Sequence, residues 1–301
     1  MRSNAANELA IQGAGRVVML ADIIEVTTAD GITLGGAYFA PRAVANDSSI
    51  DALCFFHGDG GHFYRSLYLD LGHRLAELGI AFITANRRGH DIVAGGAPGG
   101  PPKGYAYESV DESRFDYAAW LEFLAQRGHR SVAIGGHSGG AVRSVYAQSK
   151  EHYASVRAVV AVSPGEYNHE GVVALHGDLF ADTFSKAERE IAEGRTETLY
   201  KPGIPWGSTW TAEAFVDCFN PDGRYSVNQR VLETSCPTLF VFGSEECAGP
   251  QELPVCGAAM RRLRSANHPH VTVEVIDGAN HGYQDRDAQL FETIHGWLGT
   301  V

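Results

Sequence analysis

Buried strand patterns alternate with helical patterns along most of this chain. Segments that are apolar on both faces are typical of strands inside a parallel sheet, and they occur at 51–56, 80–85, 131–134, 156–162, 238–242 and 271–276. Apolar residues at helical spacing separate them, at 63–78, 109–128, 140–150, 252–266 and 286–298. We expect Ser109 to cap the second of these helices and Phe115 to face the core. The alternation predicts an α/β fold, a mostly parallel twisted sheet flanked by helices.

Two breaks in this alternation set the expected domain organisation. Residues 1–20 show little periodicity and are interpreted as an N-terminal arm, after which a hairpin at 23–27 and 32–34 opens the fold. Residues 165–235 contain no convincing strand pair, but they hold helical patterns near 184–193 and 211–219. Because this interruption is too long for a plain loop, we interpret 165–235 as an inserted helical cap on a core formed by 21–164 and 236–301.

A candidate nucleophile lies in the motif G-x-S-x-G at 136–140, with Ser138 at its centre. The motif alone is weak, because a glycine-rich chain of this length yields it by chance in an appreciable fraction of cases. Here it follows a predicted strand and precedes a predicted helix, which is the context that a nucleophile elbow requires. The serine would then project at the carboxyl end of the strand, where open α/β sheets keep their sites.

A serine nucleophile needs a base, and the base needs a carboxylate that orients it. His281 is the favoured base, because it follows a late strand and precedes the last helix. The strand predicted at 238–242 ends in a pair of glutamates, and we favour Glu246 as the acid, with Glu245 as the alternative. An acid elsewhere, for instance Asp277, stays open.

Acyl transfer also needs N–H donors aimed at the developing oxyanion. One is the N–H of Gly139, directly after the nucleophile. The glycine-rich loop at 57–61 offers the second, and we favour the N–H of Asp59, with Gly60 as the alternative. An acidic side chain beside an oxyanion is unfavourable, so we expect that of Asp59 to point away or to pair with Arg65 or Arg88.

Together these residues resemble the α/β-hydrolase superfamily, which uses the chain order Ser, acid, His. The resemblance covers nearly the whole chain from residue 21. H-G-x-x-G-x-F-Y at 57–64, N-x-R-G-H-D at 86–91 and A-E-x-x-x-A-E-G at 187–194 resemble a branch that includes fungal esterases of hydroxamate siderophores. The acid departs from the commoner Asp. In the expected pocket, the substrate-binding residues would be Tyr64, Trp206, Trp210 and Phe215.

Charge and composition exclude other classes of function. The chain carries 24 Lys and Arg against 36 Asp and Glu, a formal net charge of −12, which disfavours binding to nucleic acid and to anionic membranes. Five scattered cysteines without a C-x-x-C motif are expected to be reduced. With no signal-peptide pattern and no long apolar run, we expect a cytoplasmic protein. No cofactor or metal motif competes with the triad.

The favoured function is therefore a serine hydrolase that cleaves a small-molecule carboxylic ester or lactone through an acyl-enzyme. The same triad could instead hydrolyse a carbon–carbon bond or an amide, because the choice of leaving group depends on the pocket. A third interpretation is a non-catalytic ligand receptor that keeps the triad. The sequence leaves the oligomeric state open, and a homodimer is one of the states that it allows.

Overall fold

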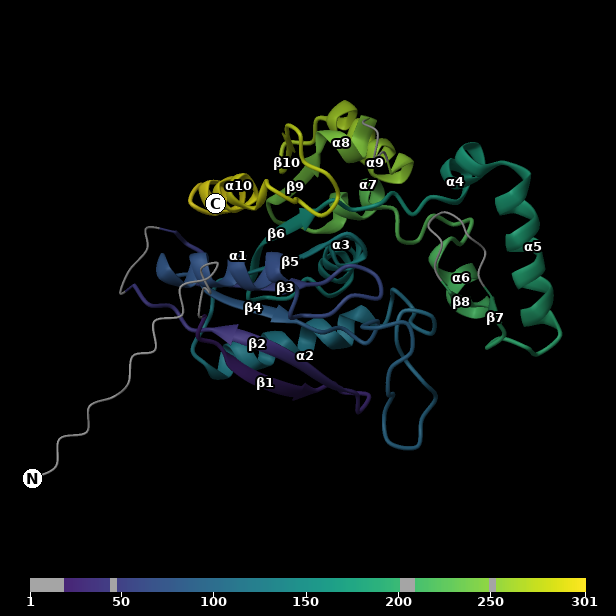
Figure 1. Ribbon diagram of the computed structural model, residues 1–301, viewed down its shortest axis with the longest axis horizontal. Coiled ribbons are helices and arrows are strands. Elements are labelled where there is room, and N and C mark those ends of the chain that lie inside the picture. Colours follow the sequence, from purple (N-terminus) through teal and green to yellow (C-terminus); the bar gives the residue numbers. More distant parts are fainter. Residues whose placement is uncertain (1–18, 44–47, 201–208, 249–252) are drawn as a thin grey trace, which may run out of the picture.

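An eight-stranded sheet forms the centre of the computed structural model, which describes residues 19–43, 48–200, 209–248 and 253–301 (Figure 1). Its strand order is β1-β2-β4-β3-β5-β6-β9-β10. The strands are β1 (Asp22–Thr27), β2 (Thr33–Phe39), β3 (Ala52–Phe56), β4 (Ala81–Ala85), β5 (Val132–His137), β6 (Val156–Val162), β9 (Thr238–Gly243) and β10 (Val271–Ile276). β2 pairs antiparallel with β1 and β4, and the other neighbours are parallel. The predicted mostly parallel sheet is confirmed.

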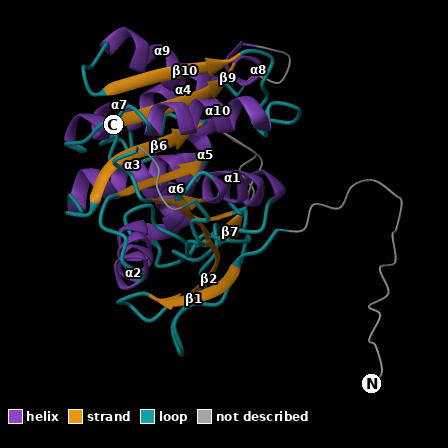
Figure 2. Ribbon diagram, turned by 90° about the vertical axis from the view of Figure 1, so that its left-hand side faces the viewer, coloured by secondary structure: helices purple, strands orange, loops and turns teal. Residues whose placement is uncertain are grey.

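Helices cover both faces of this sheet, as Figure 2 shows. α1 (Ser66–Glu77) and α10 (Asp287–Leu298) bury their apolar sides in one core. α2 (Ser113–Gln126), α3 (Gly139–Glu151) and α9 (Pro254–Ala266) bury theirs in the other. Alternating side chains of a buried strand feed both cores: in β3, Phe55 joins the first and Phe56 the second.

The second predicted helix begins later than its pattern suggested. α2 starts at Ser113, and Ser109 does not cap it: the Ser109 hydroxyl oxygen accepts from the Asp111 N–H in the turn before the helix, and its proton is donated to the Asp217 carboxylate. Phe115 is 36% exposed and lies under the guanidinium groups of Arg88 and Arg114, with 5.6 and 5.4 Å between guanidinium carbon and ring centre. The expectation that Phe115 faces the core is wrong, since cation–π contacts hold the ring at the surface.

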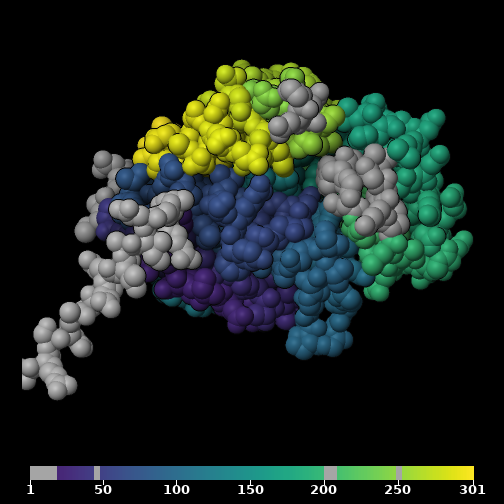
Figure 3. Space-filling view, viewed as in Figure 1, coloured from purple at the N-terminus to yellow at the C-terminus, as the bar shows by residue number. Residues whose placement is uncertain are grey.

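The chain between β6 and β9 is largely helical. It contains α4 (His169–His176), α5 (Asp178–Ala192), β7 (Leu199–Tyr200), β8 (Trp210–Thr211), α6 (Ala212–Cys218), α7 (Val227–Arg230) and the 3₁₀ helix η1 (Val231–Glu233). β7 and β8 form a two-stranded antiparallel sheet, so the expectation of no strand pair in this segment is wrong. Elements α4 to α6 gather beyond one end of the main sheet (Figures 1 and 3), whereas α7 and η1 contact α3.

The parallel strands place the predicted site residues at one edge of the sheet. The loops after β3, β5, β9 and β10 carry, in turn, the 57–61 segment, Ser138, the short helix α8 (Ser244–Ala248) and His281. Carboxyl ends of parallel strands meet at the same edge, which is why these distant segments come together. No helix within the described ranges is both long and apolar enough to cross a membrane.

Candidate active site

Ser138 occupies a strained turn between β5 and α3. Its backbone angles are φ 56° and ψ −124°, a conformation that non-glycine residues adopt only when their surroundings impose it. Glycines make the turn possible: a Cβ on Gly136 would lie 2.4 Å from the Gly140 carbonyl carbon, and one on Gly139 would lie 1.8 Å from Oδ1 of Asp59. Such turns at a strand–helix junction are typical of nucleophile elbows.

His281 lies in the same cavity as Ser138 and contacts a buried carboxylate. Its Nδ1 is 2.6 Å from Oε2 of Glu246, which is fully buried on α8. No hydrogen bond joins His281 to the Glu245 side chain, nor to the Ser138 hydroxyl, in the part of the chain that the structure describes. In serine hydrolases without a bound substrate, the hydrogen bond between the histidine and the serine is often long, and it shortens when substrate binds. The geometry therefore brings together Ser138, His281 and Glu246.

Groups that the sequence analysis missed hold the Glu246 carboxylate in place. Oε1 accepts hydrogen bonds from the Gly243 N–H at 2.7 Å and from the Ser163 hydroxyl at 2.6 Å. The Ser163 hydroxyl also forms a hydrogen bond with the Tyr283 hydroxyl, with 2.8 Å between the two oxygen atoms. Ser163 follows β6 directly and has a positive φ of 51°. A polar residue at the carboxyl end of a buried strand was the signal that could have found it.

His137, the residue before Ser138, holds the loop that carries His281. Its Nε2 lies 2.7 Å from the backbone carbonyl oxygen of His281, and its Nδ1 lies 3.0 Å from the Tyr68 hydroxyl. The carbonyl can only accept, so Nε2 carries the proton and Nδ1 accepts from Tyr68. Burial, helped by the nearby His281 and Arg65, holds the pKa of His137 well below its usual value. His137 is thus a neutral positioning residue.

The two favoured oxyanion donors are neighbours, since the Asp59 carboxylate contacts the Gly139 backbone. Asp59 lines the cavity, whereas the alternative, Gly60, does not. No hydrogen bond occupies the Asp59 N–H among the described residues. The Gly139 N–H belongs to the first turn of α3, where N–H groups have no partner within the helix. Both N–H groups therefore stay candidates for the oxyanion donors.

The Asp59 carboxylate is paired, but not with the predicted arginines. Oδ1 accepts from Arg87 at 2.7 Å and from Arg143 at 3.1 Å, and Oδ2 accepts from the Tyr167 hydroxyl at 2.9 Å. Both arginines are buried and both also pair with buried Glu108. The network contains two positive and two negative groups, so its charges balance.

Arg65 and Arg88 do not take part in this network, and the prediction that one of them pairs with Asp59 is wrong. Arg88 lies in the turn after β4 that the His90 N–H closes on the Arg87 carbonyl, and its side chain has other partners than that of Arg87. It binds the buried Asp116 at 2.8 Å and Asp30 at 2.7 Å, and braces the loop as a structural residue.

The predicted substrate-binding residues that the structure describes do not line the cavity. Trp210 and Phe215 are buried in the insertion between β6 and β9, 5.7 Å apart between ring centres. Tyr64 is 57% exposed and stacks on His62 at 3.5 Å. Trp206 lies outside the described residues. Trp210 also packs on Tyr105, with 4.5 Å between ring centres, so the buried aromatic residues of the insertion join the core on that face of the sheet.

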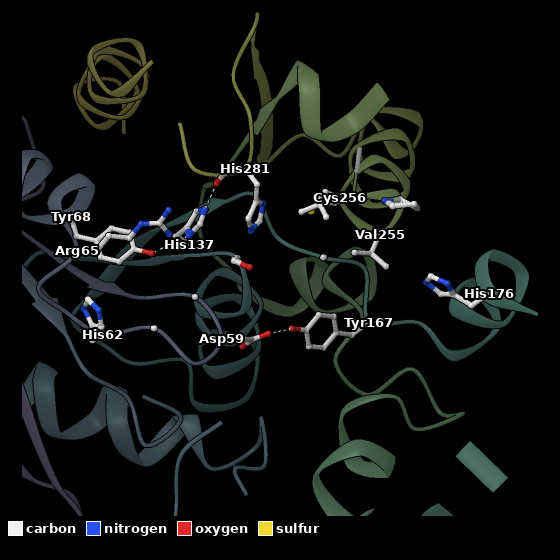
Figure 4. A pocket seen from close by; sticks show the side chains of 16 residues that line it. Asp59, His62, Arg65, Tyr68, His137, Tyr167, His176, Val255, Cys256 and His281 are labelled. Atoms are coloured by element: carbon white, nitrogen blue, oxygen red, sulfur yellow. Dashed lines mark hydrogen bonds between the residues drawn. The ribbon is translucent and has the colours of Figure 1, made fainter. Parts of the chain in front are cut away.

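The cavity has a volume of about 580 Å³. Ser138 and His281 line it together with groups from α1, from the start of α9 and from the insertion between β6 and β9, the last represented by Tyr167 and His176 (Figure 4). Such a volume is within the range of small-molecule sites.

One group of side chains could in principle ligate a metal ion. Ligand atoms of Glu246, Cys256 and His281 lie within 4.8 Å of one another. Both carboxylate oxygens of Glu246 already accept hydrogen bonds. Burial, together with the neighbouring Glu246, raises the pKa of the Cys256 thiol well above its usual value, which disfavours the thiolate that a metal requires. The arrangement suits a triad better than a metal centre.

Comparison with solved structures supports the architecture. Est1E from Butyrivibrio proteoclasticus has a TM-score of 0.59 and 16% identity, over 92% of this chain and 97% of that one. A hypothetical protein from Pseudomonas aeruginosa has a TM-score of 0.67 and 15% identity, over 99% and 98%. A monoglyceride lipase from Saccharomyces cerevisiae has a TM-score of 0.60 and 14% identity, over 98% of each chain.

At sequence identities of 14 to 16%, the similarity to these structures shows that the chain has the same fold. No curated protein matches the chain. The sequence does match the family model described as "Alpha/beta hydrolase family" over residues 55–293, which is more than half of its length. This span includes the predicted elbow, the acid and the late histidine. The chain belongs to the α/β-hydrolase family.

Proposed function

We propose that this protein hydrolyses a small-molecule carboxylic ester or lactone through an acyl-enzyme on Ser138. The observation that carries the proposal is the 2.6 Å contact of His281 Nδ1 with the buried Glu246, in a cavity that Ser138 also lines. A serine in an elbow, a histidine and a buried carboxylate are the parts of a nucleophilic triad, whatever the sequence positions.

In the proposed mechanism, the Ser138 hydroxyl oxygen attacks the ester carbonyl carbon while His281 Nε2 accepts the hydroxyl proton. Glu246 stabilises the imidazolium that forms and keeps the Nδ1 proton directed toward itself. His281 then donates the proton to the departing alcohol. A water molecule, deprotonated by the same histidine, attacks the acyl-enzyme and releases the acid.

The tetrahedral intermediate carries a negative oxygen, which the N–H groups of Asp59 and Gly139 would bind. A bare carboxylate on Asp59 would oppose this charge. Arg87 and Arg143 neutralise it with direct ion pairs, and the Tyr167 hydroxyl binds its other oxygen. The network therefore allows an acidic residue to supply an oxyanion donor.

The structural neighbours favour ester hydrolysis over the other chemistries. One structure of Est1E is described with ferulic acid bound, and the monoglyceride lipase is described with a substrate analogue. Amide or carbon–carbon bond hydrolysis would use the same residues, so a 4-nitroanilide and a β-diketone are assayed beside the esters.

The experiment is a burst assay with 4-nitrophenyl esters of increasing chain length. We expect a burst of one 4-nitrophenolate per active site or steady turnover, lost in Ser138→Ala and retained in Ser265→Ala. Ser265 is an exposed serine whose hydroxyl donates to a backbone carbonyl within α9. Turnover of an amide or a β-diketone without any ester would contradict the ester assignment, and ligand binding without any turnover would favour a receptor.

A further inference from the structure

The cavity has two chemically different sides, with the triad between them. Figure 4 shows Arg65, Tyr68 and His62 on one side of His281, and Val255, Cys256 and His176 on the other. All of these residues line the cavity. A substrate that spans the site would therefore place one part beside a guanidinium group and the other part beside an apolar wall.

Arg65 carries a positive charge that no carboxylate neutralises. It precedes α1, is exposed, and places its guanidinium carbon 5.9 Å from the centre of the Tyr68 ring. Across the described ranges of the chain, no carboxylate lies within 4.0 Å of it. Arg74, on the same helix, pairs with both Asp70 and Asp287. An arginine in a cavity without an acidic partner is available for an anionic ligand.

Two carboxylates lie at or beside the cavity, and other groups bind both of them. The buried Glu246 contacts His281 at 2.6 Å. Asp59 is the acidic residue among the lining groups, and two buried arginines already neutralise its carboxylate. The protein as a whole carries a net charge of −12. A local positive charge inside an acidic protein would favour an anionic group at that one place over other parts of the surface.

The opposite side of the cavity presents apolar surface. Leu253, Pro254 and Val255 line it where α9 begins, and Val255 is buried. This surface suits an alkyl or aryl group, since burial of apolar area contributes to binding in proportion to that area.

We propose that the preferred substrates are esters that carry both a carboxylate and an apolar group. Arg65 binds the carboxylate, and the 253–255 segment binds the apolar group. This proposal rests on the proposed ester hydrolysis. The carboxylate can belong to the acyl part or to the alcohol part of the ester. A bidentate, charge-assisted contact between guanidinium and carboxylate would raise kcat/KM for such esters by about tenfold or more relative to neutral esters.

The test compares matched anionic and neutral esters. For the acyl side, the pair is mono-4-nitrophenyl glutarate and 4-nitrophenyl pentanoate; for the alcohol side, it is 4-acetoxybenzoate and 4-acetoxybenzamide. The readout is the ratio of kcat/KM values within each pair, for wild type, Arg65→Gln and Arg65→Lys. Arg42→Gln is the control, because Arg42 is an exposed arginine that is paired with Glu77 outside the cavity.

We expect wild type to prefer the anionic ester in at least one pair, chiefly through KM. Arg65→Gln should lower that preference about tenfold or more, Arg65→Lys should restore part of it, and Arg42→Gln should leave it unchanged. Salt at about 0.5 M should weaken it in wild type.

Three results would overturn the proposal. If kcat/KM is equal for the neutral and the anionic ester in both pairs, the anion site is refuted and the proposed esterase stays intact. The same holds if Arg65→Gln lowers kcat/KM equally for both members of a pair. Absence of turnover with every ester, in an enzyme that is folded by circular dichroism, would refute the esterase and the anion site together.

Discussion

Replacement of Glu246 by glutamine should abolish most activity, because it moves the imidazole proton of His281 from Nδ1 to Nε2. Glu246 Oε1 accepts from the Gly243 N–H and the Ser163 hydroxyl, so the amide oxygen of the introduced glutamine must take that place. The amide NH₂ then faces His281 Nδ1 at the position that Oε2 now occupies, 2.6 Å away. A donor there requires Nδ1 to accept, which moves the imidazole proton to Nε2. In that tautomer Nε2 cannot accept the Ser138 proton.

The expected loss in kcat is about 10³- to 10⁴-fold, or roughly 4 to 5.5 kcal/mol of transition-state stabilisation. The free energy of unfolding should change by about 1 kcal/mol or less, because every hydrogen bond of the carboxylate has a counterpart in the amide. The assay is steady-state hydrolysis of 4-nitrophenyl acetate together with urea unfolding. Glu245→Gln is the matched control. A kcat of Glu246→Gln within tenfold of wild type, or an equal loss in Glu245→Gln, would refute the reasoning.

Further predictions concern the groups around the triad. His137→Phe should lower kcat with little change in KM, because it frees the His281 loop from its hydrogen bond, and steady-state kinetics measure this split. Burial holds the pKa values of His57 and His137 well below the usual 6.5, so the unfolded state binds more protons than the folded state as the pH falls. The free energy of unfolding, measured with urea, should therefore be fully present above about pH 6.5. Below that pH it should fall by up to about 1.4 kcal/mol per pH unit for each histidine. Arg143→Met should cost about 3–5 kcal/mol in urea unfolding, against about 1 kcal/mol or less for the partly exposed Arg114→Met; equal losses would contradict the role of burial.

The sheet was predictable because its strands are short and apolar on both faces, a pattern that few other structures produce. The helix at 109–128 shows where the reasoning failed. Ser109 has the ordinary signature of an N-cap, but its oxygen accepts from the Asp111 N–H in a turn before the helix, and its proton is donated to Asp217, which is distant in sequence. Tertiary contacts of this kind leave no trace in local sequence.

The residues of the proposed triad could be placed in outline because each follows a strand whose end was recognisable. The supporting groups could not: Arg143 lies within a helix and Glu108 within a loop, and only the fold brings both against Asp59 and Arg87. The interior position of Trp210 could not be predicted either, since aromatic residues of the 165–235 insertion have the same sequence pattern whether they face a pocket or each other.

The most direct test of the central claim is labelling with a fluorophosphonate probe, followed by mass spectrometry of the labelled peptide. We predict that the wild-type protein is labelled on Ser138, that Ser138→Ala is not labelled, and that His281→Ala is labelled far more slowly. A folded wild-type protein that resists the probe, or label on a serine other than Ser138, would contradict the account.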